Sequence, residues 1–218
     1  MAKINIAIDG PSGVGKSTIA DIVADKLNYV HLDTGAMYRC VAYYVLKNGI
    51  DYSNEEVLEK ALSDLKISFQ NDHVYLNGED VTKEIRTNDI SMMASKTSAV
   101  PMVRQKLVDL QKEIAKSKGY ILDGRDICTV VLPDAEVKIF MNADAKARAQ
   151  RRYDEYINKG IDADYETIYQ DIIARDYQDS HRKISPLKKA DDAIEIDTSH
   201  LTIDEVVDAV LNIINKEI

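Results

Sequence analysis

Residues 10–17 read Gly10-Pro11-Ser12-Gly13-Val14-Gly15-Lys16-Ser17, which follows the G-x-x-x-x-G-K-[ST] pattern of a phosphate-binding P-loop. An apolar run at residues 4–8 precedes this stretch, and a helical pattern over residues 16–27 follows it. The glycines let successive backbone N–H groups point at an anion, and the N-terminus of the next helix adds partial positive charge. A glycine-rich turn without a ligand would not explain a Lys-Ser pair that opens a helix directly after a buried strand. The chain is therefore predicted to bind a nucleoside triphosphate.

Each residue of this loop and of the helix start is expected to contact the nucleotide. Lys16 would reach the β- and γ-phosphates, and the Ser17 hydroxyl would bind Mg²⁺ carried by the nucleotide. The predicted nucleotide-binding residues are Gly10, Pro11, Ser12, Gly13, Val14, Gly15, Lys16, Ser17 and Thr18.

The composition excludes several classes of protein. The length of 218 residues and a hydrophobic fraction of 45% suit one domain with a sizeable core. A net charge of −9 without a basic stripe argues against a protein that coats a nucleic acid or an anionic membrane. No signal peptide and no apolar run of about 18 residues is visible, so a cytoplasmic location is expected. Cys40 and Cys128 lack the spacing of a metal site and are expected to be reduced thiols.

The apolar periodicity predicts an α/β fold, in which a central parallel sheet is flanked by helices. Strands are predicted at residues 4–8, 29–32, 120–123, 136–141 and 193–196, and helices at residues 16–27, 34–47, 145–159, 165–177 and after the capping box Thr202-Ile203-Asp204-Glu205. From Lys66 the period changes to two and predicts an antiparallel hairpin over about residues 66–85, with a turn at residues 70–72. Residues 160–164 are a candidate hinge or lid tip.

Two further strand ends carry polar clusters, Asp33-Thr34-Gly35-Ala36-Met37-Tyr38-Arg39 and Asp123-Gly124-Arg125-Asp126. The carboxyl ends of strands in a parallel sheet face the ligand crevice, so both clusters are expected to face the ligand. Thr34 as a helix N-cap and Gly124 as a turn residue would explain part of each cluster, but not why each one also contains an arginine. The Asn/Thr-Lys-x-Asp motif that reads guanine is missing, which argues against a GTPase switch.

A third cluster lies near the end of the last long helical pattern before the final strand. Arg175, Asp179 and Arg182 are spaced at i, i+4 and i+7, which would place an aspartate between two guanidinium groups on one helix face. A solvated helix face explains this spacing equally well, and His181 is expected to be a surface residue.

Taken together, these motifs resemble those of the bacterial cytidylate kinases, which phosphorylate CMP and dCMP. The matching segments are residues 8–18, 32–39, 78–86, 123–126 and 135–140. A P-loop is generic, but D-G-P-S-G-x-G-K-S followed by D-T-G-A-x-Y-R and D-G-R-D in this order is highly specific, and the resemblance covers essentially the whole chain.

This resemblance implies a P-loop kinase core in a single domain over residues 1–218. It further implies an insertion at about residues 66–98 that helps to bind the monophosphate, and a short helical lid at about residues 148–165. ATP would be the phosphoryl donor with Mg²⁺, and CMP and dCMP the acceptors. No nucleic acid or membrane partner is expected, and the protein is expected to be a monomer.

The resemblance also assigns roles to single residues. Ser95, Arg104 and Asp126 would face the cytosine edge, Arg39 and Arg125 would hold the acceptor phosphate, Arg175 and Asp179 would hold the sugar, and Thr34 and Tyr38 complete the predicted substrate-binding set. Arg182 would lie near the phosphates being bridged and is also assigned to that set, and the predicted catalytic residues are Lys16, Arg125 and Arg182. Thr34 stands where some members carry serine, which keeps the hydroxyl. Arg148, Arg151 and Arg152 are candidates for the lid arginine.

Other functions remain to be separated by experiment. An adenylate kinase is disfavoured by the short lid region, and a shikimate kinase by the hairpin insertion and the chain length. A regulatory module that binds a nucleotide without an acceptor would have no use for arginines at two further strand ends. Release of ADP that depends on CMP would distinguish a kinase from such a module.

Overall fold

The computed structural model describes residues 3–70 and 73–217, and the chain divides into two compact units. The first, called here the sheet unit, joins the segment that ends at Leu32 to the segment that begins at Ile114. The second, called the hairpin unit, runs from Asp33 to Glu113. Neither unit contains, in its described part, a helix that is long and apolar enough to cross a membrane.

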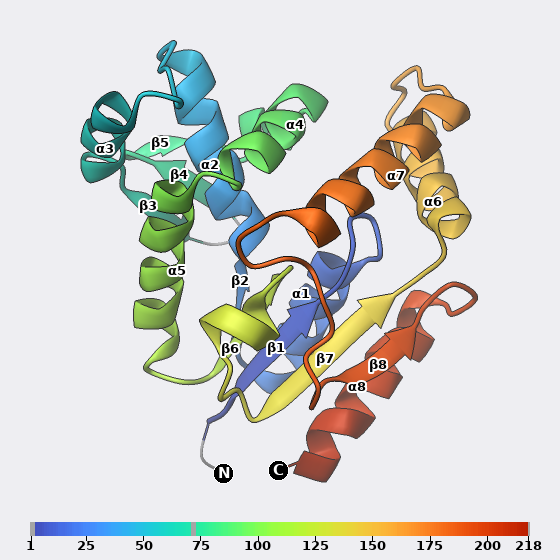
Figure 1. The fold of residues 1–218 in the computed structure, drawn as a ribbon. Helices are drawn as coiled ribbons and strands as arrows, with labels where there is room; N and C mark the ends of the chain where they lie inside the picture. The colour runs from blue at the N-terminus through green and yellow to red at the C-terminus, as the bar shows by residue number, and fades with distance from the viewer. Residues whose placement is uncertain (1–2, 71–72, 218) are drawn as a thin grey trace. The chain divides into compact units, whose positions relative to one another are not determined.

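A five-stranded sheet with the strand order β2-β6-β1-β7-β8 forms the centre of the sheet unit (Figure 1). The strands are β1 (Asn5–Asp9), β2 (Val30–Asp33), β6 (Tyr120–Gly124), β7 (Val137–Asn142) and β8 (Ile194–Asp197). Strand β1 pairs in parallel with β6 and with β7, and β7 pairs in parallel with β8. All five residues of β1 are buried, because a strand covered on both faces exposes no side to water. The predicted parallel sheet is confirmed, and no strand limit differs from its prediction by more than one residue.

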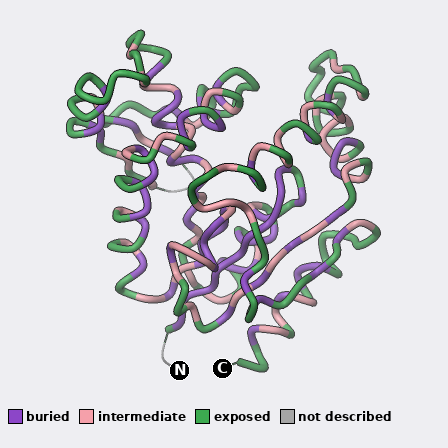
Figure 2. Tube along the Cα trace, in the orientation of Figure 1, coloured by how far each residue is buried: buried purple, intermediate pink, exposed green. Residues whose placement is uncertain are grey.

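Two helices cover the sheet and supply its main core. α1 (Lys16–Leu27) and α8 (Ile203–Glu217) pack against each other and against the sheet. The core side chains include Ile6, Ile8, Val23, Ile139, Val207 and Val210, all of them buried. In Figure 2, the buried parts of the trace are purple and gather in the central sheet and the helices behind it. Helix α8 begins with the predicted capping box, since the Thr202 N–H donates to the Glu205 carboxylate and the Glu205 N–H donates to the Thr202 hydroxyl.

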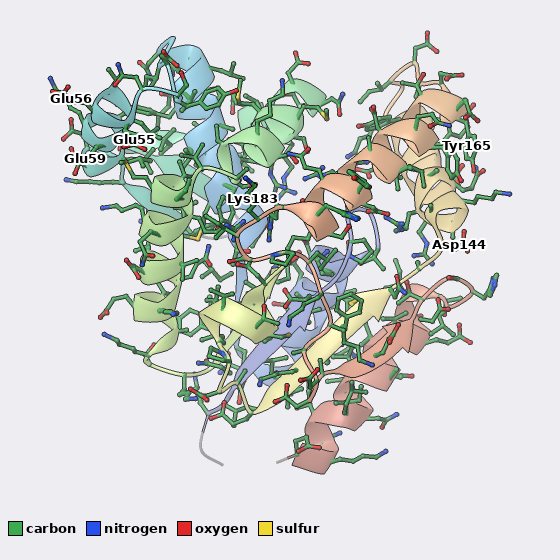
Figure 3. The ribbon with its side chains drawn as sticks, viewed as in Figure 1. Glu55, Glu56, Glu59, Asp144, Tyr165 and Lys183 are labelled. Carbon is green, nitrogen blue, oxygen red and sulfur yellow. The ribbon has the colours of Figure 1, made fainter. Side chains whose placement is uncertain are left out.

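The helices α6 (Ala145–Asn158) and α7 (Tyr165–His181) pack against each other and contain the predicted lid region. A small apolar cluster of Ala149, Ile168 and Ile172 joins them. Tyr165, at the start of α7, packs edge-on against the Tyr153 ring of α6 (Figure 3). Helix α7 continues four residues beyond its predicted end at residue 177, and this extension carries Asp179 on a helical turn.

The hairpin unit contains a second, antiparallel sheet with the order β3-β4-β5. Its elements are α2 (Thr34–Lys47), α3 (Glu55–Ser63), β3 (Ile67–Gln70), β4 (His73–Leu76), β5 (Glu79–Asp80) and α4 (Asn88–Thr97), and α5 (Pro101–Ala115) begins in it. The predicted hairpin is confirmed, with Ile67 opposite Leu76, although Asn71 and Asp72 of its predicted turn lie outside the described residues. Asn77 and Gly78 both have positive φ, as a two-residue turn between twisted strands requires, and they lead into β5, which the sequence did not predict.

Gly10 at the start of the P-loop allows a test of the backbone geometry. Its φ is 155°, and a Cβ atom there would lie 2.1 Å from the carbonyl oxygen of Met141. Gly10→Ala should therefore lower the free energy of unfolding by about 3 kcal/mol through overpacking and strain. In thermal unfolding without nucleotide, this corresponds to a Tm lower by about 6–12 °C. The control Gly49→Ala, with positive φ but no neighbouring atom within 4 Å, should cost only about 1 kcal/mol, and equal losses would contradict the argument.

Candidate active site

The P-loop connects β1 to α1 through a backbone that only glycine adopts easily. Gly10, Gly13 and Gly15 have φ values of 155°, 76° and 98°. Gly15 is the N-cap of α1 and supplies no side chain to bind the first N–H groups of the helix. These groups are therefore available to an anion, and the helix dipole favours negative charge at the same place.

Lys16 lies within this loop rather than extending into solvent. Its ammonium nitrogen is 2.8 Å from the carbonyl oxygens of Gly10 and of Pro11, and the residue is only 5% exposed. Burial lowers the pKa of Lys16 to about 7, and the charge of Arg125 acts in the same direction. A polyphosphate bound in the loop would restore a strong preference for the ammonium form, because it brings compensating negative charge.

Ser17 and Asp123 form a pair of oxygen ligands next to the loop. The Ser17 hydroxyl donates to Oδ2 of Asp123 at 2.9 Å. Burial alone would raise the pKa of Asp123, but the hydrogen bond and charge of His31, the charge of Lys16 and the Ser17 hydroxyl hold it below its usual value. An ionised carboxylate beside a hydroxyl suits Mg²⁺, which proteins bind through one or two carboxylates while phosphates and water complete the octahedron. From the sequence, Asp123 was recognised only as part of the Asp123-Gly124-Arg125-Asp126 motif, and no role was predicted for it.

No group of three or more metal-ligating side chains lies close enough to hold a metal ion within residues 3–70 and 73–217. The pair Ser17 and Asp123 supplies two oxygen ligands, which fits a metal ion whose other ligands are nucleotide phosphates and water.

An arginine-rich cluster follows the carboxyl end of β6. The Arg125 guanidinium donates to Oδ2 of Asp179 on α7 at 2.8 Å, and Asp179 is 6% exposed. Burial alone would raise the pKa of Asp179, but Arg125 first, and then Arg175 and Arg182, hold it below its usual value. The two arginines predicted to neighbour Asp179, Arg175 and Arg182, thus both act on its carboxylate. Arg125 is a third partner, which helical spacing could not reveal because it lies on another element.

Arg182 is the C-cap residue at the end of helix α7. The helix ends at His181, and Arg182 still has a helical φ of −63°, while its ψ of 143° turns the chain that follows it away from the helix. One nitrogen of its guanidinium lies 3.7 Å from Oδ1 of Asp126. The charges of both Arg175 and Arg182 lower the pKa of Asp179, in keeping with the predicted spacing of these three residues.

The loop after α7, which begins at Arg182 and Lys183 (Figure 3), holds this arginine in place. The Ser185 carbonyl accepts a hydrogen bond from Arg182 Nε at 2.5 Å, and the Leu187 N–H donates to the Asp179 carbonyl at 2.8 Å. No role was predicted from the sequence for Ser185-Pro186-Leu187. The two contacts show that this segment folds back onto the end of α7.

Asp9, the last residue of β1, is hydrogen-bonded to the turn that follows Asp126. Its two carboxylate oxygens accept the N–H groups of Ile127 at 2.9 Å and Cys128 at 2.8 Å. Burial raises the pKa of Asp9 to about 6, although these two hydrogen bonds oppose the shift. Asp9 thereby anchors the backbone directly after the Arg125-Asp126 pair.

A cavity of about 350 Å³ lies beside the P-loop, a size typical of small-molecule sites. Val14, Ile19 and Leu201 give it apolar walls, while Arg151 and Arg152 add positive charge. The contribution of Thr198, Leu201, Thr202 and Ile203 to this cavity was not predicted, because the capping box at Thr202 indicates a helix start and not a ligand site.

The three candidate lid arginines occupy different environments. Arg148 is 4% exposed and binds the Asp176 carboxylate through two nitrogens at 3.0 and 2.5 Å and the Ser12 carbonyl at 3.1 Å. These contacts tie α6 to α7 and to the P-loop. Arg151 hydrogen-bonds Thr198, and only Arg151 and Arg152 of the three line the cavity.

In the hairpin unit, Arg39 lies close to Asp33 at the start of α2. Asp33 is the N-cap, since its Oδ1 accepts the Ala36 N–H, so the interpretation of Thr34 as the cap is wrong. Oδ2 of Asp33 accepts from Arg39 at 2.8 Å, and a second guanidinium, that of Arg86, lies 3.8 Å away. Nε of Arg39 is buried without a hydrogen-bond partner in the part of the chain that the structure describes.

Tyr38 and Arg104 meet within the same unit. The Arg104 guanidinium lies 5.3 Å from the centre of the Tyr38 ring, and its Nε donates to the Ser98 carbonyl at 3.2 Å. Arg104 is 4% exposed, and Ser95, one turn before Ser98, is also buried. The predicted base-reading residues Ser95 and Arg104 thus lie at neighbouring helix ends, α4 and α5.

The chain is similar in sequence to known proteins. The family model described as cytidylate kinase matches residues 6–216. A cytidylate kinase of Ligilactobacillus salivarius is 53% identical, covering 98% of this chain and 97% of the relative, and one of Fusobacterium nucleatum is 48% identical, covering 100% and 98%.

Solved structures show the same fold at low identity. An uncharacterised protein of Eubacterium ventriosum is 15% identical with a TM-score of 0.53, covering 99% of both chains. A shikimate kinase of Bacteroides thetaiotaomicron is 13% identical with a TM-score of 0.51, covering 98% of this chain and 99% of the other. At such identities, the likeness concerns the fold alone.

The raised pKa of buried Asp9 predicts that the stability of the protein depends on pH. Its pKa in the folded protein, about 6, lies above the ordinary value of 3.8, so the stability contributed by the protonated form is present below about pH 4 and is lost as the pH rises through 6. Asp9→Asn cannot ionise. Its free energy of unfolding relative to wild type should therefore increase by about 2 kcal/mol between pH 4 and pH 7. Urea unfolding of both proteins measures this, and a difference that stays constant over the range would contradict it.

Proposed function

This chain belongs to the cytidylate kinase family, and we propose that it transfers the γ-phosphoryl group of ATP to CMP and dCMP, forming CDP and dCDP. The observation that carries the proposal is the parallel pairing of β1 with β6, in which Asp9 lies opposite Gly124. The P-loop follows one strand and the Asp123-Gly124-Arg125-Asp126 segment ends the other. A phosphate-binding loop and an arginine cluster thus share one edge of the sheet, as transfer between two phosphates requires.

The donor nucleotide would bind along the P-loop. Backbone N–H groups from Gly10 to Thr18, except at Pro11, would surround the β- and γ-phosphates, with the Lys16 ammonium among them. The cavity beside the loop has the volume and the apolar walls that an adenine base needs, and Arg151 and Arg152 lie at its border. The cavity supports ATP as the donor because it opens directly onto Gly13 and Gly15.

Ser17 and Asp123 would hold Mg²⁺ together with the nucleotide phosphates. When bound, the ion neutralises charge that develops on the transferred group. The part of the protein is to fix the two oxygen ligands, and the 2.9 Å hydrogen bond between them shows that they already lie within reach of one another.

The acceptor assignments come from the family pattern. Arg39 and Arg125 would bind the phosphate of CMP, and Arg125 is oriented for this by Asp179. Arg175 and Asp179 would bind the sugar, and Arg182 would lie near the phosphates being bridged. Thr34, Tyr38, Ser95, Arg104 and Asp126 complete the proposed substrate-binding set.

The chemistry needs no nucleophilic side chain, because the CMP phosphate itself attacks. The protein has to align two nucleotides, neutralise their charge and exclude water that would hydrolyse ATP. The insertion at about residues 66–98 and the lid at about residues 148–165 would close for this purpose. A cytoplasmic location, a monomeric state and the absence of nucleic-acid or membrane partners remain predictions.

A substrate panel with Lys16→Met tests the function. ADP formation from ATP and Mg²⁺ should depend on CMP or dCMP and stay low with AMP, UMP or shikimate.

Lys16→Met keeps the side-chain volume but removes the charge, so kcat should fall more than about tenfold, or at least 1.4 kcal/mol of barrier. The control Lys26→Met, at the exposed end of α1, should retain wild-type kcat. Strong turnover of AMP or shikimate, or full activity of Lys16→Met, would contradict the proposal.

Base selection is tested at Asp126. A carboxylate accepts a hydrogen bond from the N4 amino group of cytosine and repels O4 of uracil. Asp126→Asn adds an amide donor and should reduce the preference for CMP over UMP by about 1–3 kcal/mol, measured as the ratio of the two kcat/KM values. Asp134→Asn, at an exposed site, is the control. An unchanged ratio in Asp126→Asn would leave Ser95 and Arg104 as the base-reading residues.

A further inference from the structure

Four polar side chains of the sheet unit are joined in a row by hydrogen bonds, and this row is called here the circuit. The Ser17 hydroxyl donates to Oδ2 of Asp123 at 2.9 Å, and Nε2 of His31 lies 2.8 Å from the other oxygen, Oδ1. Nδ1 of His31 lies 2.5 Å from Oδ1 of Asp21. Ser17 and Asp21 are four residues apart on α1, so the two ends of the circuit lie on the same helix face one turn apart.

The circuit occupies both oxygens of the Asp123 carboxylate. Carboxylate oxygens accept hydrogen bonds, so each ring nitrogen of His31 donates one. Burial alone would lower the pKa of His31, but the hydrogen bonds and charges of Asp123 and Asp21 raise it to about 10, which agrees with two N–H donors. No sequence motif marks His31, because the pattern D-T-G-A-x-Y-R begins two residues later, at Asp33.

A purely stabilising ion pair is a weak explanation for this arrangement. The side chains of His31 and Asp123 are only 9% and 5% exposed, and the desolvation of two buried charges offsets much of their attraction. Asp21, in contrast, is 63% exposed and remains hydrated. The circuit therefore runs from a solvated carboxylate to the buried one that faces the P-loop.

We propose that His31, held by Asp21, is a positioning residue that fixes the orientation of the Asp123 carboxylate in the metal–nucleotide site. The inference rests on the proposed binding of Mg²⁺ with ATP at Ser17 and Asp123. His31 restricts rotation of the carboxylate about its terminal bond, so that Oδ2 stays directed at the Ser17 hydroxyl. Partners that orient a ligating carboxylate in this way affect metal affinity about 10–100-fold when they are removed.

Calorimetry of ATP binding without CMP, in Mg²⁺ or in EDTA, tests the role without measuring catalysis. His31→Phe keeps a ring of similar size but removes both donors. The gain in ATP affinity that Mg²⁺ provides should fall about 10–100-fold, whereas affinity in EDTA should stay within twofold of wild type. His31→Gln keeps one N–H donor and should recover part of the gain. The matched control is His73→Phe in β4, where the histidine is paired with Asp80 at 2.7 Å in the hairpin unit.

Asp21→Ala is the second variant, and its exposed position makes it independent of whether His31→Phe folds. It should lose a smaller part of the Mg²⁺-dependent gain, because His31 keeps its bond to Asp123 but loses its own support. Asp25→Ala, an exposed carboxylate one turn further along α1, should leave the gain unchanged.

The outcomes separate this inference from the proposed function. If the wild-type protein binds ATP with the same affinity in Mg²⁺ and in EDTA, this result would contradict the proposed metal site itself. A wild-type gain that survives in His31→Phe or in Asp21→Ala would overturn only the role of His31. Equal losses in Mg²⁺ and in EDTA would also overturn it, because they indicate a general structural role.

Discussion

The parallel pairing of β1 with β6 is the interaction on which the candidate site depends. It places Asp9 opposite Gly124, so that the start of the P-loop and the Asp123-Gly124-Arg125-Asp126 segment leave the sheet at the same edge. Asp9 reinforces the pairing, since its buried carboxylate binds the N–H groups of Ile127 and Cys128. One strand pair therefore defines where a phosphate can bind and where charged groups surround it.

Buried ion pairs are concentrated around this edge. Arg125 binds Asp179, Arg148 binds Asp176 and His31 binds Asp123, and each pair has at least one partner that is nearly inaccessible to water. Such pairs add little net stability, because desolvation offsets most of the attraction. Their benefit is orientation, since a guanidinium or carboxylate with fixed partners presents its remaining groups to a ligand in one direction. The same electrostatics perturb the pKa values of Lys16, Asp9 and Asp179, a pattern that is concentrated at functional sites.

Two differences between prediction and structure have a common cause. Helix α7 ends at His181, four residues beyond its predicted end, and Asp33 rather than Thr34 caps α2. Both differences lie at helix ends, and the position of an end depends on how nearby backbone groups find partners. Local periodicity describes the interior of a helix well but not the residue at which it stops.

The sequence alone determined the parallel α/β fold, the antiparallel hairpin, the P-loop and the family to which the chain belongs. Apolar periodicity and short motifs are local properties, because strand and helix patterns repeat within a few residues and glycine is needed wherever φ is positive. Tertiary structure alone decided that Arg125 binds Asp179, that Arg148 ties α6 to α7 while Arg151 and Arg152 line a cavity, and that His31 reaches Asp123. These contacts join residues between 28 and 92 positions apart, and only the folded chain brings such distant side chains within hydrogen-bond distance.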